Sequence, residues 1–189
     1  NEGSPVNNIN VLSHASDIDG DTVSVTTASA ANGTVLINPD GTLNYTSNAS
    51  FSGLDTVTYT IEDGNGGTDT GSFFVFVNAV NDPPQANADV AAGMEDTPLD
   101  VFVLSNDVDV DSSIDTSSVQ IVGTANPGDS LTVPGEGIWS VNSINGTITF
   151  LPDANFNGTV STQQYTVADV DGARSAPANI NVSISATND

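Results

Sequence analysis

The stretch that decides the fold is TVTYTI, residues 56–61. Val57, Tyr59 and Ile61 fall on one side of an extended chain there, and three threonines fall on the other. Alternation of apolar and polar residues with a period of two is typical of a β-strand that buries one face. We therefore expect a half-buried strand at this position.

Hairpin signals lie on both sides of this strand. The segments GTVLI (33–37) and GTLNY (41–45) flank the turn residues NPD (38–40), and Asn145-Gly146 marks a second turn between two apolar segments. Pro, Asp and Asn-Gly favour the tight turns of β-hairpins. No stretch shows the period of an amphipathic helix. Short strands broken by turns predict an all-β protein built of Ig-like or cadherin-like β-sandwiches.

The chain repeats itself. SDIDGDTVSV in the first half is answered by DVDVDSSIDTSSVQIV in the second, VTYTIEDGNGG by QQYTVADVDG, and NAVND (78–82) by SATND (185–189). Self-similarity over this distance indicates two copies of one structural unit. We expect two tandem β-sandwiches joined end to end, with domains at residues 1–82 and 83–189.

The join between the copies is short and stiff. Each proline of Asn81-Asp82-Pro83-Pro84 fixes its own φ and restricts the residue before it. Residues 83–93 have no counterpart ahead of Asn1, so we expect the first copy to lack its N-terminal strand. The chain then reads as a segment of a longer tandem array.

The charge of the chain is strongly one-sided. It has 24 Asp and Glu residues, one Arg and no Lys, for a formal net charge of -23. Two carboxylates about 5 Å apart repel by roughly 3 kcal/mol at an effective dielectric near 20, and Asp17, Asp19 and Asp21 lie within five residues. Such a loop either extends into water, as Asp-rich turns commonly do, or closes around a cation. Carboxylate oxygens are hard ligands that suit Ca²⁺.

The composition also argues against several functions. An acidic surface repels nucleic acid and anionic lipid, whose affinity comes from Lys and Arg, and no apolar run approaches the length of a membrane span. We expect no nucleic-acid partner and no membrane insertion. There is no Cys and only one His, and neither HExxH nor GxSxG is present, so we expect no enzymatic activity.

Longer motifs carry a family resemblance. DIDGDTVSV, GTVLINPDGTLNYTSNASFSGLDTVTYTIEDGNGGTDT and VNAVNDPP resemble the bacterial cadherin-like tandem repeats of large surface and RTX-type adhesins. The second copy, through GIWSVNSINGTITFLPDANFNGTVSTQQYTVADVDGARSAPANINVSI, is also similar to CshA-type fibril repeats. The resemblance implies one Ig-like or cadherin-like sandwich per copy, calcium at the junctions, and a location outside the cell or on a bacterial cell surface.

The same resemblance implies a set of calcium ligands, drawn from the start of each repeat, the linker and the apical loops. The junction of the two copies would use Glu2, Asn81, Asp82, Asp107, Asp109, Asp111, and Asp169 or Asp171. The matching loops of the first copy are Asp17, Asp19, Asp21 and Asp63, and a following junction would use Glu95, Asn188 and Asp189. Ala15 stands where the second copy has Asp107. Neither loop has the spacing of an EF-hand.

The function implied is that of calcium-stiffened extender repeats in the stalk of an adhesin, supporting cell adhesion or biofilm formation. Its partners would be neighbouring repeats of the same chain, with a glycan or another adhesin chain beyond them. The alternative is a carbohydrate- or partner-binding module of a secreted protein. Phe74, Phe76 and Trp139 are the aromatic candidates for such a surface.

Four single residues complete these expectations. Phe74 and Phe76 point outward from the strand FFVFV (73–77), where either a neighbouring loop covers them or they form a lateral contact. Trp139 belongs to an alternating strand and is expected in the core, with a sugar-stacking surface role as the alternative. Arg174 is expected to form a local ion pair with the acids at 169 and 171.

Overall fold

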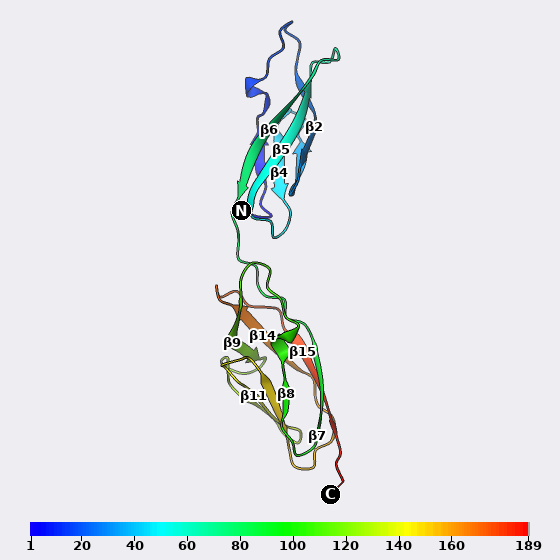
Figure 1. The fold of residues 1–189 in the computed structure, drawn as a ribbon, viewed down its shortest axis with the longest axis vertical. Coiled ribbons are helices and arrows are strands. Elements are labelled where there is room, and N and C mark those ends of the chain that lie inside the picture. The colour runs from blue at the N-terminus through cyan, green and yellow to red at the C-terminus, as the bar shows by residue number, and fades with distance from the viewer. Residues whose placement is uncertain (189) are drawn as a thin grey trace. The chain divides into compact units, whose positions relative to one another are not determined.

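The computed structural model describes residues 1–188 and divides into two compact units, Asn1–Val80 and the part that begins at Asn81. Figure 1 shows that both are built from strands, and no α-helix occurs among the described residues. No helix in this part of the chain is long and apolar enough to cross a membrane. The expected all-β fold of two sandwich domains is confirmed.

The first unit has two three-stranded sheets. One has the order β1 (Val6–Ile9), β4 (Leu43–Ser47), β3 (Gly33–Ile37), and the other β2 (Ser24–Ala30), β5 (Gly53–Glu62), β6 (Thr68–Val77). A 3₁₀ turn, η1 (Leu12–His14), precedes the first acidic loop.

The quoted strand and hairpin of this unit form as predicted. TVTYTI lies inside β5, with Val57 fully buried and the threonines on the outer face mostly exposed. β3 and β4 pair from Gly33↔Ser47 to Ile37↔Leu43 around the predicted turn. Gly41 has a φ of +82° there, a conformation that glycine adopts without steric cost.

The second unit has a four-stranded and a five-stranded sheet. The first has the order β10 (Leu131–Val133), β11 (Gly137–Val141), β12 (Ile148–Pro152), β8 (Leu99–Val101). The second has the order β13 (Gly158–Thr159), β15 (Ala178–Ser185), β14 (Gln163–Asp169), β9 (Ile114–Ile121), and β7 (Asp89–Met94) pairs in parallel with β15. A 3₁₀ turn, η2 (Val103–Ser105), precedes the second acidic loop.

Trp139 lies in the core of the second unit. Its side chain is 0% exposed and its ring centroid is 4.6 Å from that of Phe150. The expectation of a core tryptophan is confirmed, and the alternative of a sugar-stacking surface residue is wrong, because the alternation along β11 turns this side chain inward.

Two other expectations need correction. Phe74 and Phe76 are 68% and 69% exposed, so the cover by a neighbouring loop is wrong, since both residues stand on the outward face of β6. Arg174 does not form the expected local ion pair within the described residues. Its guanidinium donates to Thr166 Oγ1 and to the Ser118 carbonyl, because a bridge between Ala168 and Arg174 directs it along β14.

Candidate functional site

The acidic residues of the second unit gather where its chain begins. Asn81 Nδ2 donates to Asp169 Oδ2 at 2.8 Å, and the backbone N–H of Asp82 donates to Asp111 Oδ2 at 3.1 Å. Asp169 ends β14, and Asp111 lies in the loop between η2 and β9. The start of this unit is therefore held by two loops that are far apart in the sequence. We call this group, with Asp109, the apical cluster.

Asp109 is the residue of the apical cluster whose bonding is incomplete. Its Oδ1 accepts from the N–H groups of Asp111 at 3.2 Å and Ser112 at 2.6 Å. Its Oδ2 is buried and has no partner among the described atoms, and neither has the Oγ of Ser112. A buried carboxylate oxygen without a partner is costly. A hard cation would satisfy it, so the donor set fits Ca²⁺.

The surroundings of Asp169 favour the ionised form of its carboxyl group. Its side chain is 2% exposed, and Oδ1 accepts from the N–H of Ala173 at 2.9 Å. Burial alone would raise the pKa of Asp169, but the hydrogen bonds from Asn81 and the backbone of the turn outweigh it and hold this pKa below its ordinary value. Asp171 is exposed. The sequence left open whether Asp169 or Asp171 belongs to the site. Asp169, which is buried, accepts the hydrogen bond from the linker residue Asn81.

Asp107 lies beneath the apical cluster. The hydroxyl of Tyr165 is 2.9 Å from both of its carboxylate oxygens, and the N–H of Asn87 donates to Oδ1 at 2.8 Å. The same hydroxyl is 2.9 Å from the carbonyl of Val103. Burial raises the pKa of Asp107. The oxygens of Asp107 thus take part in a support network, and its role as a direct calcium ligand stays a prediction.

Asp89 belongs to this support network and was not anticipated. It is 8% exposed, and its Oδ2 is buried without a partner among the described atoms. Burial raises the pKa of Asp89 to about 6, the charge of Asp107 adds to this, and a hydrogen bond from Tyr165 opposes it. An acid at the start of a strand was the one signal in the sequence that could have pointed to it.

Replacing Asp89 by asparagine should therefore stabilise the second unit at neutral pH. The native state keeps a proton on Asp89 up to about pH 6, while the unfolded chain loses it near pH 4, so the free energy of unfolding falls as pH rises through this window. We expect D89N to gain about 1 to 3 kcal/mol at pH 7 and little at pH 4. Urea unfolding at pH 4 to 7, without divalent cations, measures the difference.

The exposed acid Asp153 provides the matched control, because D153N removes the same charge from the surface. Its effect should be within about 0.5 kcal/mol at every pH. A D89N variant that is less stable than the wild type at pH 7 would show that the carboxylate is needed as an acceptor.

The first unit repeats the loop geometry. Asp17 Oδ1 accepts from the N–H groups of Asp19 at 2.8 Å and Asp21 at 3.3 Å, as Asp109 does in the second unit. Asp63 Oδ1 accepts from the N–H groups of Asn65 at 2.7 Å and Gly67 at 2.9 Å.

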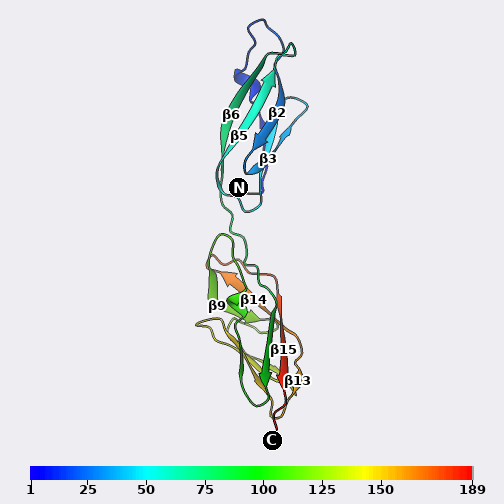
Figure 2. The same ribbon diagram turned by 45° about the vertical axis from the view of Figure 1, so that its right-hand side comes forward.

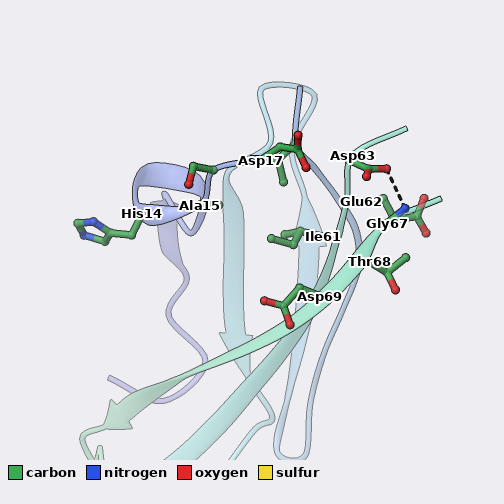
Figure 3. Close-up of a pocket in the computed structure, with 11 residues that line it drawn as sticks. His14, Ala15, Asp17, Ile61, Glu62, Asp63, Gly67, Thr68 and Asp69 are labelled. Atoms are coloured by element: carbon green, nitrogen blue, oxygen red, sulfur yellow. Dashed lines mark hydrogen bonds between the residues drawn. The ribbon is translucent and has the colours of Figure 1, made fainter. Parts of the chain in front are cut away.

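The two loops of the first unit border a shared hollow. Asn65 Nδ2 donates to Asp21 Oδ2 at 2.7 Å, which ties the loops together. A pocket of about 380 Å³ includes Asp17 and Asp63 in its lining. Figure 3 shows these two carboxylates at its upper end and the His14 imidazole directed away from them. The structure thus brings the four expected acids of this unit into two adjacent loops.

Glu2 and Glu95 lie at the other end of their units. Glu95 is 4% exposed, and its carboxylate accepts from the N–H of Thr187 at 2.6 Å and from Asn157 Nδ2 at 3.1 Å. The bond from Thr187, with that from Asn157, lowers the pKa of Glu95 against the effect of burial. Glu2 Oε1 accepts from the N–H of Val80 at 2.5 Å in the same way.

The remaining residues expected at a following junction are only partly described. Asn188 is exposed, and Asp189 lies outside the described residues. Glu95 is engaged with its own unit, as the preceding contacts show. Its role toward a further repeat stays a prediction.

The fold agrees with the family comparisons. The profile of the bacterial cadherin-like domain matches residues 81–186, and that of the bacterial Ig domain matches residues 1–75. The chain is thus a tandem of adhesion-type domains of an extracellular class. Through its second unit, it belongs to the bacterial cadherin-like domain family. No curated protein matches the sequence.

Solved structures with a similar fold include cadherin ectodomains. Human protocadherin-24 EC1-2 is 17% identical, with 91% of this chain and 85% of that chain covered and a TM-score of 0.48. The human desmocollin-1 ectodomain is 10% identical, with 86% and 34% covered and a TM-score of 0.46. An endo-fucoidan hydrolase of glycoside hydrolase family 107 is 14% identical, with 90% and 24% covered and a TM-score of 0.38. The chain spans about a third of the desmocollin-1 ectodomain.

Proposed function

We propose that the chain is a pair of calcium-stiffened extender repeats from the stalk of a long bacterial surface or secreted adhesin. The observation that carries the proposal is the buried, unpartnered Oδ2 of Asp109, in the loop that also holds the linker residue Asp82 through Asp111. A cation there would satisfy an oxygen that nothing else in the described chain satisfies. In this reading the repeats support cell adhesion or biofilm formation by holding a binding domain away from the cell.

The ligands that we propose for this ion come from the apical cluster. They are Asn81, Asp82, Asp109, Asp111 and Asp169, with Asp171 at the exposed edge of the same turn. Their oxygens are carboxylates and amides, which match the preference of Ca²⁺ for about six to eight oxygen ligands. Asp107 supports the loop from below. Glu2 belongs to the first unit, and its part in the ligand set rests on the family resemblance alone. In the first unit, Asp17, Asp19, Asp21 and Asp63 would hold a corresponding ion.

The proposed stiffening comes from the linker residues that the ion would bind. Asn81 and Asp82 directly precede Pro83 and Pro84, so only a few backbone dihedrals can change the path of the chain there. Ligands on the linker lose their freedom when the ion binds. Extracellular calcium modules bind with a Kd of about 10⁻⁴ to 10⁻³ M, which is sufficient at millimolar calcium.

Small-angle X-ray scattering of the intact chain tests the proposed function. With a few millimolar calcium, the distribution of interatomic distances should narrow relative to the same sample in EDTA, because the linker samples fewer conformations. Calorimetric titration on the same sample establishes whether calcium binds. Binding without any change in scattering would reject stiffening, and no binding would reject the calcium site.

The second candidate function is a carbohydrate- or partner-binding module. The exposed pair Phe74 and Phe76 favours it, together with Leu54, which lies opposite Phe76 and is 60% exposed. Three large exposed apolar side chains on one strand pair form a patch, and such patches often mark a binding surface. Saturable binding of the chain to a panel of polysaccharides, lost in the variant F74T/F76T, would favour this function over the extender.

A further inference from the structure

A carboxyl group is buried in the core of the first unit. Asp55 lies on the inward face of β5 with its side chain 1% exposed, and Val57, two residues further on, is 0% exposed. Strands of the two sheets that surround it, β5 of one and β3 of the other, can be followed in Figure 2. A buried charge destabilises a domain unless hydrogen bonds compensate for it. The hydrogen bonds of Asp55 therefore determine whether its charge can be kept in the core.

The carboxylate of Asp55 accepts four hydrogen bonds. The Tyr45 hydroxyl donates to Oδ2 at 2.8 Å, and the backbone N–H of Asn32 donates to the same oxygen at 3.1 Å. Oδ1 accepts from the backbone N–H of Thr56 at 2.8 Å and from Asn32 Nδ2 at 3.4 Å. Donors directed at both oxygens favour the ionised form of a carboxyl group.

These hydrogen bonds join the two sheets of the first unit. Asp55 belongs to β5, in the sheet β2–β5–β6, whereas Tyr45 belongs to β4, in the sheet β1–β4–β3. Asn32 lies in the turn between β2 and β3, where the chain passes from one sheet to the other. One carboxylate thus connects both sheets and the crossing between them. We call Asp55, Tyr45 and Asn32 the inter-sheet clasp.

The second unit has an apolar pair at the equivalent positions. YTSNASFSG (45–53) is answered by FLPDANFNG (150–158), so Tyr45 corresponds to Phe150, and Asp55, two residues after the segment, corresponds to Val160. Phe150 and Val160 are 0% and 2% exposed. A sandwich of this kind can therefore pack its sheets at this point without a charge, and the clasp is a feature of the first unit.

Tyr45 is the titratable group that contacts Asp55. Burial raises the pKa of Tyr45 to about 12, and the bond to Asp55 and its charge add to this, so the hydroxyl remains a neutral donor. Burial alone would raise the pKa of Asp55, but the hydrogen bonds from Tyr45, Asn32 and Thr56 outweigh it and hold this pKa below its ordinary value. Asn32 and Val75, which lies opposite Asp55 on β6, carry no charge. The clasp thus contains one group that titrates in acid.

We infer that the inter-sheet clasp is an acid-sensitive device, which holds the two sheets of the first unit together while Asp55 is ionised and lets them separate when Asp55 is protonated. A proton on this carboxyl group places a donor where O–H and N–H donors already point. Because the folded-state pKa is lowered, the clasp is at full strength above about pH 4, the pKa of an unfolded aspartate, and is lost as pH falls through the folded-state pKa. The inference is independent of the proposed calcium function.

The test compares the intact chain with the variant Tyr45→Phe/Asp55→Val, which carries the apolar pair of the second unit. Calorimetry in EDTA measures the melting temperature of the first unit at pH 7 and at pH 2.5. The change on acidification should be more negative in the wild type than in the variant, by about 5 °C or more, because only the wild type loses the clasp. Asp69→Asn removes an exposed acid of β6 and should keep the wild-type change.

A direct titration keeps the test decisive if the double variant does not fold. The ¹³C signal of the Asp55 carboxyl carbon, followed by NMR in the wild type, should titrate below the ordinary range of aspartate. In Tyr45→Phe, which keeps the charge and removes one donor, it should titrate about half a pH unit higher or more. An Asp55 signal that titrates at or above the ordinary value would overturn the inference. An equal effect of acid on the wild type and on Tyr45→Phe/Asp55→Val would overturn it as well.

Discussion

Replacement of Trp139 by alanine is expected to destabilise the second unit strongly and to leave the stability of the first unit unchanged. The indole is 0% exposed and packs on Phe150 at 4.6 Å between ring centroids. Truncation of a buried Trp to Ala costs about 3 to 5 kcal/mol, and a domain has only about 5 to 15 kcal/mol in total. Differential scanning calorimetry should show that one transition moves down by 10 °C or more, on the order expected from such a loss, while the other stays.

The neighbouring residue gives a matched control. Ile138 precedes Trp139 on β11 and is 39% exposed, so I138A removes apolar atoms from the outer face of the same strand. I138A should lower the free energy of unfolding of the second unit by less than about 1 kcal/mol. Trp139→Phe should fall between the two, because it keeps much of the packing and removes an indole N–H that is buried without a partner. Equal shifts in W139A and I138A would contradict the core assignment.

Local patterns in the sequence were sufficient to predict the quoted strands and the acidic loops. Alternation in TVTYTI placed Val57 in the core, and the turn residues at 38–40 placed the β3–β4 hairpin. The acidic loops could also be found in this way, because the carboxylate of an Asp accepts from N–H groups two to four residues later, as Asp17 and Asp63 do. Such hydrogen bonds join residues that are close in the sequence, so the local sequence predicts them.

Local patterns could not predict contacts between distant residues; those of Asn81 and Asp82 with Asp169 and Asp111 were expected only from the family resemblance. Tyr165 is 58 residues from Asp107, and nothing in either segment indicates that they meet. Whether Phe74 and Phe76 are covered depends on loops elsewhere, and the expectation of cover failed for that reason.

The second prediction with a large expected effect concerns the apical cluster. Asp109→Asn should abolish the stabilisation of the second unit by calcium. At 10 mM calcium, a Kd of about 10⁻⁴ to 10⁻³ M stabilises a domain by roughly 1.4 to 2.7 kcal/mol, which raises its melting temperature by about 5 to 15 °C. Asparagine has the same shape as aspartate, but it lacks the charge that an ion requires and can donate where Oδ2 has no partner.

Two controls separate the ion from general charge effects. D153N changes the net charge equally on an exposed residue away from the acidic loops and should keep the full calcium response. D17N alters the equivalent loop acid of the first unit and should change only the transition of that unit. Calorimetry in 10 mM calcium and in EDTA resolves all three variants. If D109N keeps the calcium response of the wild type, the buried Oδ2 of Asp109 is not a ligand, and the apical cluster is a network of turn hydrogen bonds only.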